Sequence, residues 1–126
     1  MRIRKFIAEN DHATVAEWWQ GHGWPVVPPH LLPPYGIIVD GLCAGWLYKT
    51  DSRIGWLEWV VSNPKASARE VYDGMVMMFD LLKEESKRRG DAAIFSALKS
   101  RGLIRFYKNQ GFEESDSGMT HMVLRW

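Results

Sequence analysis

Cysteine is nearly absent from this sequence: Cys43 is the only one in 126 residues, so no disulfide can form within the chain. The apolar residues around Cys43 predict a buried thiol instead of a nucleophile. No apolar run approaches the roughly 20 residues that cross a membrane, and no secretory apolar region follows Met1 to Lys5. We therefore expect a cytoplasmic protein that has no membrane partner.

An excess of one charge is also missing. The 16 basic residues nearly balance the 15 acidic ones, and a net charge of +1 gives no electrostatic reason to expect DNA or RNA as a partner. The four histidines are scattered, with no pair at a metal-ligand spacing, so we expect no metal site. Neither a glycine-rich Walker loop nor a Gly-x-Ser-x-Gly elbow occurs.

Hydrophobic periodicity and turn residues divide the chain into strands and helices. Five of the six prolines fall between Trp24 and Pro34, which excludes a helix or a central strand there. Asp40-Gly41 is a hairpin signal, Ser67 and Glu70 match a capping box, and Gly90 would end the helix that follows. The expected strands are 1–8, 36–39, 42–48, 54–61, 93–98 and 119–126, and the expected helices are 10–20 (capped by Asn10 or Asp11), 67–89 and 100–109.

This order of elements predicts a single α/β (α+β) domain over residues 1–126. Three antiparallel strands lead into a helical crossover, which makes the strands around Trp59 and Ile94 parallel. The expected sheet is therefore mixed and mostly antiparallel, with a central parallel pair and with helices on both faces. The apolar strand 93–98 is typical of one that is buried on both faces.

Side-chain patterns predict which residues form the core. An inward stripe runs along the helix 67–89, and Val15, Trp18 and Trp19 share one face of the first helix. In the strand 54–61, alternation places Leu57, Trp59 and Val61 on one face and Trp56, Glu58 and Val60 on the other. The stripe of the long helix consists of Val71, Met75, Met78, Phe79 and Leu82.

The element order, together with the segment Ile104 to Phe112, resembles the GCN5-related N-acetyltransferase (GNAT) superfamily. In that family a helix ending Tyr-x-x-x-Gly-Phe follows the fifth strand, and Tyr107, Gly111 and Phe112 match this motif. The resemblance covers nearly the whole chain as topology, whereas in sequence only this motif is specific. Trp18-Trp19, the proline segment and Ser62-Asn63-Pro64 also resemble small acyltransferase-like proteins of bacteriophages.

The resemblance implies acetyl-CoA as acyl donor. In the family, strands four and five diverge, here after about Val60 and before about Ser96, and the free backbone of strand four binds the pantetheine arm. By that likeness the main chain of Val60, Val61 and Ser62 would hold pantetheine, and the tip of the next helix would face the pyrophosphate. The residues implied around the phosphates are Lys65, Ser67, Ala68, Arg69, Glu70 and, at the start of the last helix, Ser100.

The expected phosphate loop departs from the family pattern Gln/Arg-x-x-Gly-x-Gly/Ala. The corresponding stretch is Ser67-Ala68-Arg69-Glu70-Val71-Tyr72, which lacks both glycines and adds a carboxylate. The capping box would also occupy amides that a pyrophosphate needs, although Lys65 and Arg69 could offset the charge. This departure is the main argument against catalysis.

Two residues are candidates for proton transfer. Tyr107 matches the tyrosine that protonates the leaving thiolate in many family members; the alternative is an aromatic anchor for its helix. Glu58 lies on the fourth strand, where some relatives carry the base that deprotonates the amine; the alternative is a solvent-facing or salt-bridged strand residue.

Two functional hypotheses follow. The first is an acyl-CoA-dependent N-acyltransferase that acts on a small-molecule or peptide amine. The second is a related binding or interaction module that has lost catalysis. Exposed edge strands could support a homodimer, and Trp19, Trp24 and Tyr35 could line an acceptor cleft or pack as core or lid.

Overall fold

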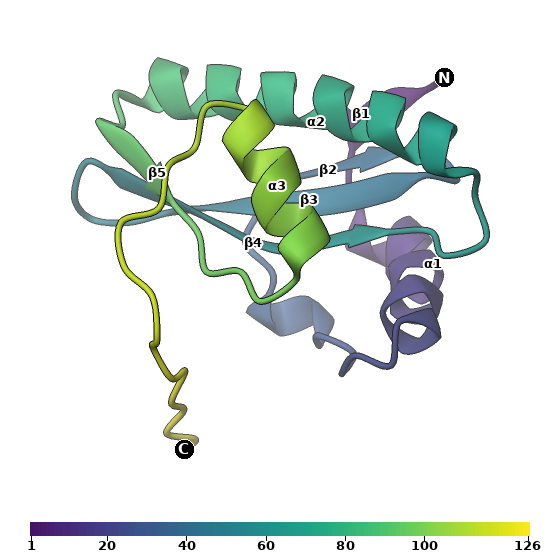
Figure 1. Ribbon diagram of the computed structural model, residues 1–126. Coiled ribbons are helices and arrows are strands. Elements are labelled where there is room, and N and C mark those ends of the chain that lie inside the picture. The colour runs from purple at the N-terminus through teal and green to yellow at the C-terminus, as the bar shows by residue number, and fades with distance from the viewer.

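The computed structural model describes residues 1–126 as a five-stranded sheet flanked by helices on both faces (Figure 1). The strands follow the order β1-β2-β3-β4-β5, and all neighbours are antiparallel except β4 and β5, which are parallel. This confirms the predicted fold class. The elements are β1 (Ile3–Lys5), α1 (Ala8–Gly21), the 3-10 helix η1 (Pro29–Leu31), β2 (Gly36–Val39), β3 (Cys43–Lys49), β4 (Ile54–Ser62), α2 (Ala68–Arg89), β5 (Ala93–Phe95) and α3 (Arg101–Asn109).

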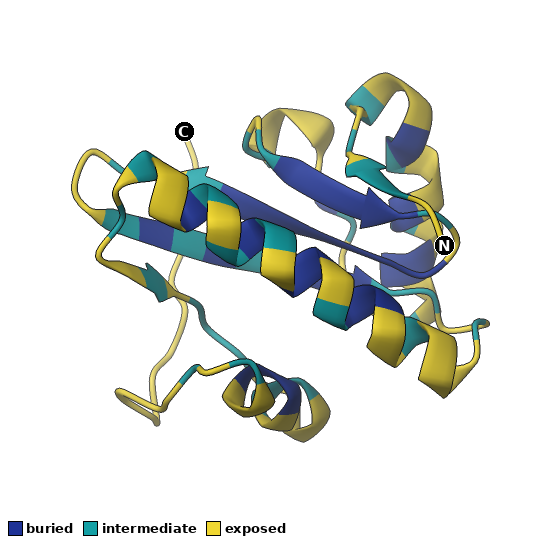
Figure 2. Ribbon diagram, turned by 90° about the horizontal axis from the view of Figure 1, so that it is seen from above, coloured by how far each residue is buried: buried dark blue, intermediate teal, exposed yellow.

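The helix α2 covers one face of the sheet and forms the larger core. Ser67 caps its first turn, and Gly90, at φ 83°, ends it in the left-handed conformation that glycine adopts without a steric penalty. Its predicted stripe is confirmed: Met75, Met78, Phe79 and Leu82 are buried, and Val71 packs at the edge of the cluster. Seen from above, α3 lies to one side of α2 and packs Phe106 and Tyr107 into the same cluster (Figure 2).

The helix α1 covers the opposite face with a smaller, tryptophan-rich core. The predicted face of Val15, Trp18 and Trp19 is buried there against Trp46 of β3. The proline segment crosses this side and contributes the buried Val27. It forms no strand, as expected, but it includes the short helix η1, which was not expected.

The predicted cap of α1 is wrong, because the helix begins one turn earlier than Asn10 or Asp11. Asp11 lies inside the first turn and is 4% exposed. Its carboxylate accepts two hydrogen bonds from the Arg4 guanidinium, at 2.7 and 2.8 Å, and one from the Ile7 amide at 2.8 Å. This buried ion pair ties α1 to β1, and it pulls Asp11 away from a capping role.

A β-bulge in β4 changes the predicted faces of that strand. Two residues of β4, Trp59 and Val60, lie opposite one residue of β3, and Trp59 has a φ of 63°. The extra residue reverses the alternation: Leu57 and Val60 both pack in the α2 core, whereas Val61 packs in the α1 core. The expected grouping of Val60 with Glu58, and of Trp59 with Leu57 and Val61, is therefore wrong.

The C-terminal part of the sheet is smaller than predicted. β5 ends at Phe95 and lies at the edge, so it is not buried on both faces, and the parallel pair is not central. Residues 119–126 form no strand, because Gly118 turns the chain away with a φ of 71° and no backbone partner follows. The chain end leaves the sheet on the side of α1, with Met122 and Trp126 exposed (Figure 1).

Two further expectations have clear outcomes, one for the thiol of Cys43 and one for the helices. Cys43 is fully buried, and burial raises the pKa of its thiol to about 12, as expected for an inert side chain. None of the helices is long and apolar enough to pass through a lipid bilayer.

Candidate active site

The two parallel strands separate soon after they pair. The last paired residues are Trp56 and Phe95. Beyond them the Ser96 hydroxyl, instead of a backbone amide, donates to the Leu57 carbonyl oxygen at 2.6 Å. The predicted divergence is confirmed, but it starts at Trp56, earlier on β4 than the expected Val60. The later half of β4 therefore has no strand partner on the β5 side.

A groove of about 570 Å³ lies beside this unpaired half of β4, between the start of α2 and the start of α3. We call it the β4–α3 groove. Its lining is mostly apolar and includes Met75 and Tyr72 of α2 and Leu103 and Phe106 of α3. An apolar slot with a polar rim suits a long, thin ligand that carries few charges along most of its length.

The groove brings together four of the residues implied as cofactor contacts, and it leaves five outside. Val60, Ser62, Ala68 and Ser100 line it. The other five do not: the side chain of Val61 packs in the α1 core, and Lys65, Ser67, Arg69 and Glu70 stand outside the lining.

The tip of α2 carries the expected capping box in a modified form. Ser67 Oγ accepts a hydrogen bond from the Glu70 amide at 3.2 Å, and the Ser67 hydroxyl donates to the Glu70 carboxylate at 3.0 Å. The cap thus occupies one amide. The first helical hydrogen bond is donated by Val71 to the Ser67 carbonyl oxygen at 3.0 Å, so the Ala68 and Arg69 amides remain free.

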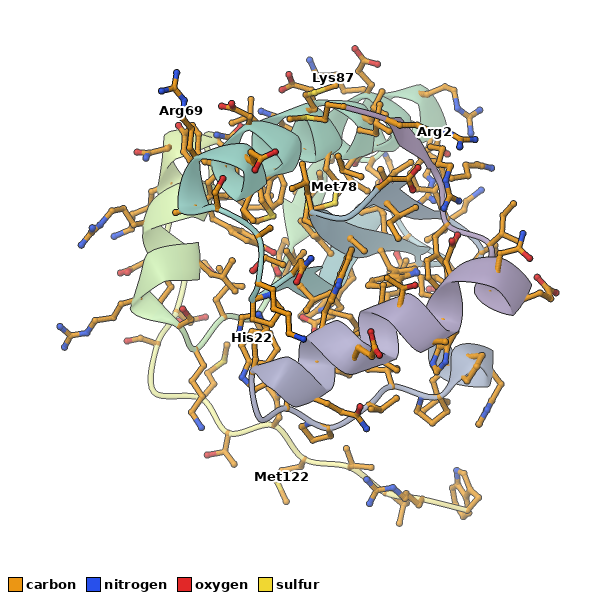
Figure 3. The ribbon with its side chains drawn as sticks, turned by 90° about the vertical axis from the view of Figure 1, so that its right-hand side faces the viewer. Arg2, His22, Arg69, Met78, Lys87 and Met122 are labelled. Carbon is orange, nitrogen blue, oxygen red and sulfur yellow. The ribbon has the colours of Figure 1, made fainter.

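The basic side chains near this tip do not converge on the groove. Arg69 points outward from α2, on the far side from His22, in the view onto this end of the molecule (Figure 3). Lys65 is exposed, and its amide donates to the Asn63 side-chain oxygen at 3.0 Å. We expected Lys65 and Arg69 to offset the charge of Glu70, but neither side chain lines the groove.

A histidine and a tryptophan form the wall of the groove on the α1 side. His22 follows α1 and donates from Nε2 to the Ser62 carbonyl oxygen at 2.9 Å. Its ring stacks on Trp24, with centroids 4.4 Å apart and planes inclined by 19°. The His22 hydrogen bond thus already occupies one lone pair of a carbonyl oxygen on a residue that lines the groove.

Tyr107 is buried on α3, as the interpretation of an aromatic anchor predicts. Its ring is 2% exposed and packs against Phe79 and Phe112, with centroid distances of 4.9 Å, so it does anchor α3. Burial raises the pKa of its phenol well above the usual value, and the Glu58 carboxylate adds to this, while the Ser96 hydroxyl opposes it. The phenol therefore stays protonated at neutral pH but is a weaker acid than an ordinary tyrosine, and its residue borders a cavity of about 650 Å³.

Glu58 lies beside the point where the strands separate, and it is neither fully exposed nor paired with a cation. Its carboxylate accepts from the Trp56 indole at 3.1 Å and weakly from the Ala97 amide at 3.4 Å. Burial raises the pKa of Glu58, while these two hydrogen bonds and the nearby His121 lower it. A carboxylate with a raised pKa is better matched to taking a proton from an amine than an ordinary one.

The cavity beside Tyr107 is closed on its outer side by residues 113–121, the segment that follows α3. Ser96, Ala97 and His121 line it together with Tyr107. Tyr107 therefore borders this cavity and Glu58 contacts Ala97 of its lining, whereas the β4–α3 groove lies on the other side of α3.

Sequence reasoning missed the bulge at Trp59, the stacked pair of His22 and Trp24, and the Ser96 hydroxyl. A tryptophan at positive φ carries no sequence signal, because such residues rarely adopt this conformation. The expectations for the other aromatic residues have mixed outcomes: Trp19 is core at 2% exposure, whereas Trp24 lines the groove. Tyr35 packs at the edge of the α2 core, with Lys5 and Arg89 over its ring.

The fold is that of the GNAT acetyltransferases. A GNAT family acetyltransferase from Streptococcus pneumoniae superposes with a TM-score of 0.65 at 16% identity, over 98% of each chain. The ribosomal-protein-S18-alanine N-acetyltransferase from Escherichia coli gives 0.69 at 15% identity, over 91% of this chain and 79% of that one. Glucosamine-6-phosphate N-acetyltransferase from Arabidopsis thaliana gives 0.65 at 14%, over 96% and 97%.

Sequence comparison adds nothing to this likeness, since no family model and no curated protein matches the chain. At these identities the similarity defines a fold. What the chain binds and does must be argued from its own residues.

Proposed function

We propose that this protein is an acyl-CoA-dependent N-acyltransferase that uses acetyl-CoA and acts on an amine. The observation that carries the proposal is the separation of β4 from β5 beyond Trp56 and Phe95, with an apolar groove beside the freed half of β4 and with Glu58 and Tyr107 near the opening. The GNAT fold supports the same reading.

The groove fits the cofactor in its apolar part and less well at its charged end. Val60, Met75 and Leu103 would contact the pantetheine arm, and the free amides of Ala68 and Arg69 would meet the phosphates at the positive end of the α2 dipole. Acetyl-CoA, when bound, supplies an acyl group activated as a thioester. The protein supplies orientation, an apolar environment and proton transfer.

Glu58 and Tyr107 divide the proton transfers between them. Glu58 would accept a proton from the ammonium form of the acceptor, because only the neutral nitrogen is nucleophilic and the raised pKa of the carboxyl makes it a stronger base. Tyr107 would donate its phenolic proton to the departing sulfur. Its raised pKa keeps the phenol protonated at neutral pH, so the proton is present when the sulfur leaves. Ser96 would then orient the Tyr107 hydroxyl, beside which it lies.

A binding module without catalysis is the second candidate, and the tip of α2 favours it. Glu70 brings a carboxylate to the helix end and its amide is taken by Ser67. His22 also engages the Ser62 carbonyl oxygen. Both contacts would weaken acyl-CoA binding relative to an open, glycine-lined loop.

Thermal unfolding with acetyl-CoA separates the two candidates. A ligand at ten times its Kd adds about 1.4 kcal/mol to the free energy of unfolding, which in a chain of this size raises Tm by about 4–7 °C. Ala68→Trp should abolish this rise, because Ala68 is exposed and lines the groove. Met77→Trp, at an exposed position of α2 outside the groove lining, is the matched control and should keep it.

Three results would contradict the proposal. The first is no rise in Tm and no calorimetric heat at millimolar acetyl-CoA. The second is a rise that persists in Ala68→Trp, which would place the ligand elsewhere. The third is tight binding with no acetyl transfer to any amine in a broad panel, which would favour the binding module.

A further inference from the structure

A partly uncovered row of aromatic rings crosses three strands on the α1 side of the sheet, with Tyr48 and Trp56 half-buried. Tyr48 of β3 pairs in register with Trp56 of β4, and Trp56 pairs with Phe95 of β5. Cross-strand partners project to the same face, and the Trp56 and Phe95 ring centroids are 6.0 Å apart. Phe95 is 45% exposed, although a ring of this size usually lies in a core.

The row is partly uncovered because α1 and η1 protect only the neighbouring part of this face. The next ring along β3, Trp46, is fully buried under α1. At the row itself, η1 makes one hydrogen bond with a ring: the Tyr48 hydroxyl donates to the Leu31 carbonyl oxygen at 2.6 Å. Figure 1 shows η1 and the C-terminal segment on this side of the sheet, with no helix between them.

The bulge brings a fourth ring to the row. Trp59 is 38% exposed, and its indole donates to the Tyr48 hydroxyl at 2.9 Å, so the two rings are held together. A φ of 63° is a strained conformation for a bulky residue. The strained backbone and the hydrogen bond to Tyr48 together hold the Trp59 ring at the surface.

A single carboxylate borders these rings. Glu58 is two residues from Trp56 on the same strand face, and the Trp56 indole donates to it at 3.1 Å. No lysine or arginine forms an ion pair with Glu58. Its hydrogen-bond partners are the Trp56 indole and the Ala97 amide, with His121 nearby, so this partly buried carboxylate has no lysine or arginine partner and can pair with a cation from outside the chain.

We propose that the aromatic face (Tyr48, Trp56, Trp59 and Phe95, around Glu58) binds a small primary amine with one positive charge and an aromatic or alkyl body. The ammonium group pairs with Glu58, and the body lies over the neighbouring rings of Trp56 and Phe95. This deepens, and rests on, the proposed transfer to an amine, since Glu58 is also its base. It narrows the acceptor to apolar amines, because the face offers one carboxylate and few groups that could bind hydroxyls or phosphate.

Binding of 2-phenylethylamine without acetyl-CoA tests the site independently of catalysis. Tryptophan fluorescence should respond, because Trp56 and Trp59 belong to the site, and calorimetry gives the Kd. Glu58→Gln keeps an acceptor oxygen for Trp56 but removes the charge, and should raise the Kd about tenfold; Phe95→Ser should raise it about threefold. Tyr72→Ala removes an exposed ring in the β4–α3 groove instead, and should leave amine binding unchanged while weakening acetyl-CoA binding.

Two further probes test the chemistry of the ligand. The neutral isostere 2-phenylethanol should bind about tenfold more weakly than the amine, and glucosamine, a polar amine, should not compete. Saturable amine binding that both Glu58→Gln and Phe95→Ser weaken supports the proposal, even if acetyl-CoA proves not to bind. No amine binding, equal affinity for the alcohol, or an unchanged Kd in folded Phe95→Ser protein overturns it, even if acetyl-CoA binds.

Discussion

The cap of α2 should affect stability and cofactor binding in opposite directions, and the variant Ser67→Ala separates the two effects. The Ser67 hydroxyl accepts from the Glu70 amide and donates to the Glu70 carboxylate. Removing it therefore leaves a third free amide at the helix tip, beside those of Ala68 and Arg69. It also releases the Glu70 carboxylate, which can then swing away into solvent.

The loss of stability should be small, because the cap is exposed. Replacing an N-cap serine by alanine costs about 0.5–2 kcal/mol, and the long hydrogen bond to the Glu70 amide, 3.2 Å, favours the lower half of that range. In a domain of this size, a loss of about 1 kcal/mol lowers Tm by roughly 3–5 °C. The free amide and the positive helix dipole should meanwhile strengthen acetyl-CoA binding by up to about tenfold.

The assay is thermal unfolding over a range of acetyl-CoA concentrations, followed by calorimetry for the Kd. Ser67→Ala should begin at a lower Tm than the natural protein and show a larger rise with ligand. Glu70→Gln should also show the larger rise, since it removes the carboxylate and keeps a polar side chain. Glu84→Gln, which neutralises an exposed carboxylate farther along α2, is the matched control and should change neither quantity.

The reasoning is refuted if Ser67→Ala loses stability and binds acetyl-CoA no better, or more weakly. That result would mean that the cap helps to shape the phosphate site instead of obstructing it. Equal strengthening by Glu70→Gln and Glu84→Gln would point to the net charge of the chain as the cause, and would also count against the local argument.

Three further predictions concern catalysis, packing and acid stability. Tyr107→Phe should lower acetyl transfer at least tenfold while keeping the Kd for acetyl-CoA, as measured by thiol release and calorimetry; unchanged turnover removes the acid role. Gly36→Ala should cost about 1–3 kcal/mol in urea unfolding, because a Cβ there would lie 2.4 Å from the Trp46 ring; an unchanged midpoint would mean that the ring can move. Arg88 lowers the pKa of Glu85 to about 2, below roughly 4.3 in the unfolded chain, so the stabilisation is complete above that pH and is lost as pH falls toward 2. Glu85→Gln should therefore flatten the fall in the urea midpoint over this range, and the same fall in both proteins would contradict it.

The features predicted correctly depend on short stretches of chain. Asp40-Gly41 marks the turn correctly, with Gly41 at a φ of 75°, although the loop also includes Leu42 and so has three residues instead of the expected two. Gly90 ends α2 in the same left-handed conformation. The α2 stripe is local too, because the helical period alone decides which side chains share a face. The crossover then fixes the direction of β5. These rules apply before any tertiary contact forms.

The features predicted wrongly depend on partners far away in the chain. Residues 119–126 have the composition of a strand, but a strand exists only where another backbone pairs with it, and here none does. Asp11 is a good cap by type, yet the Arg4 guanidinium on β1 draws it into a buried ion pair. The side-chain position of His22, on the Ser62 carbonyl oxygen, likewise depends on how α1 meets β4.

The bulge at Trp59 connects the fold to both halves of the candidate site. Without the extra residue, strict alternation would place Val60 on the face of Glu58 and turn its side chain away from the β4–α3 groove that it now lines. The same reversal lets Trp59 leave the core and reach the Tyr48 hydroxyl, beside the aromatic face. One strained residue therefore sets which side chains of β4 would meet the cofactor and which would meet the acceptor in the proposed reaction. This accounts for strain being tolerated in the middle of the longest strand of the sheet.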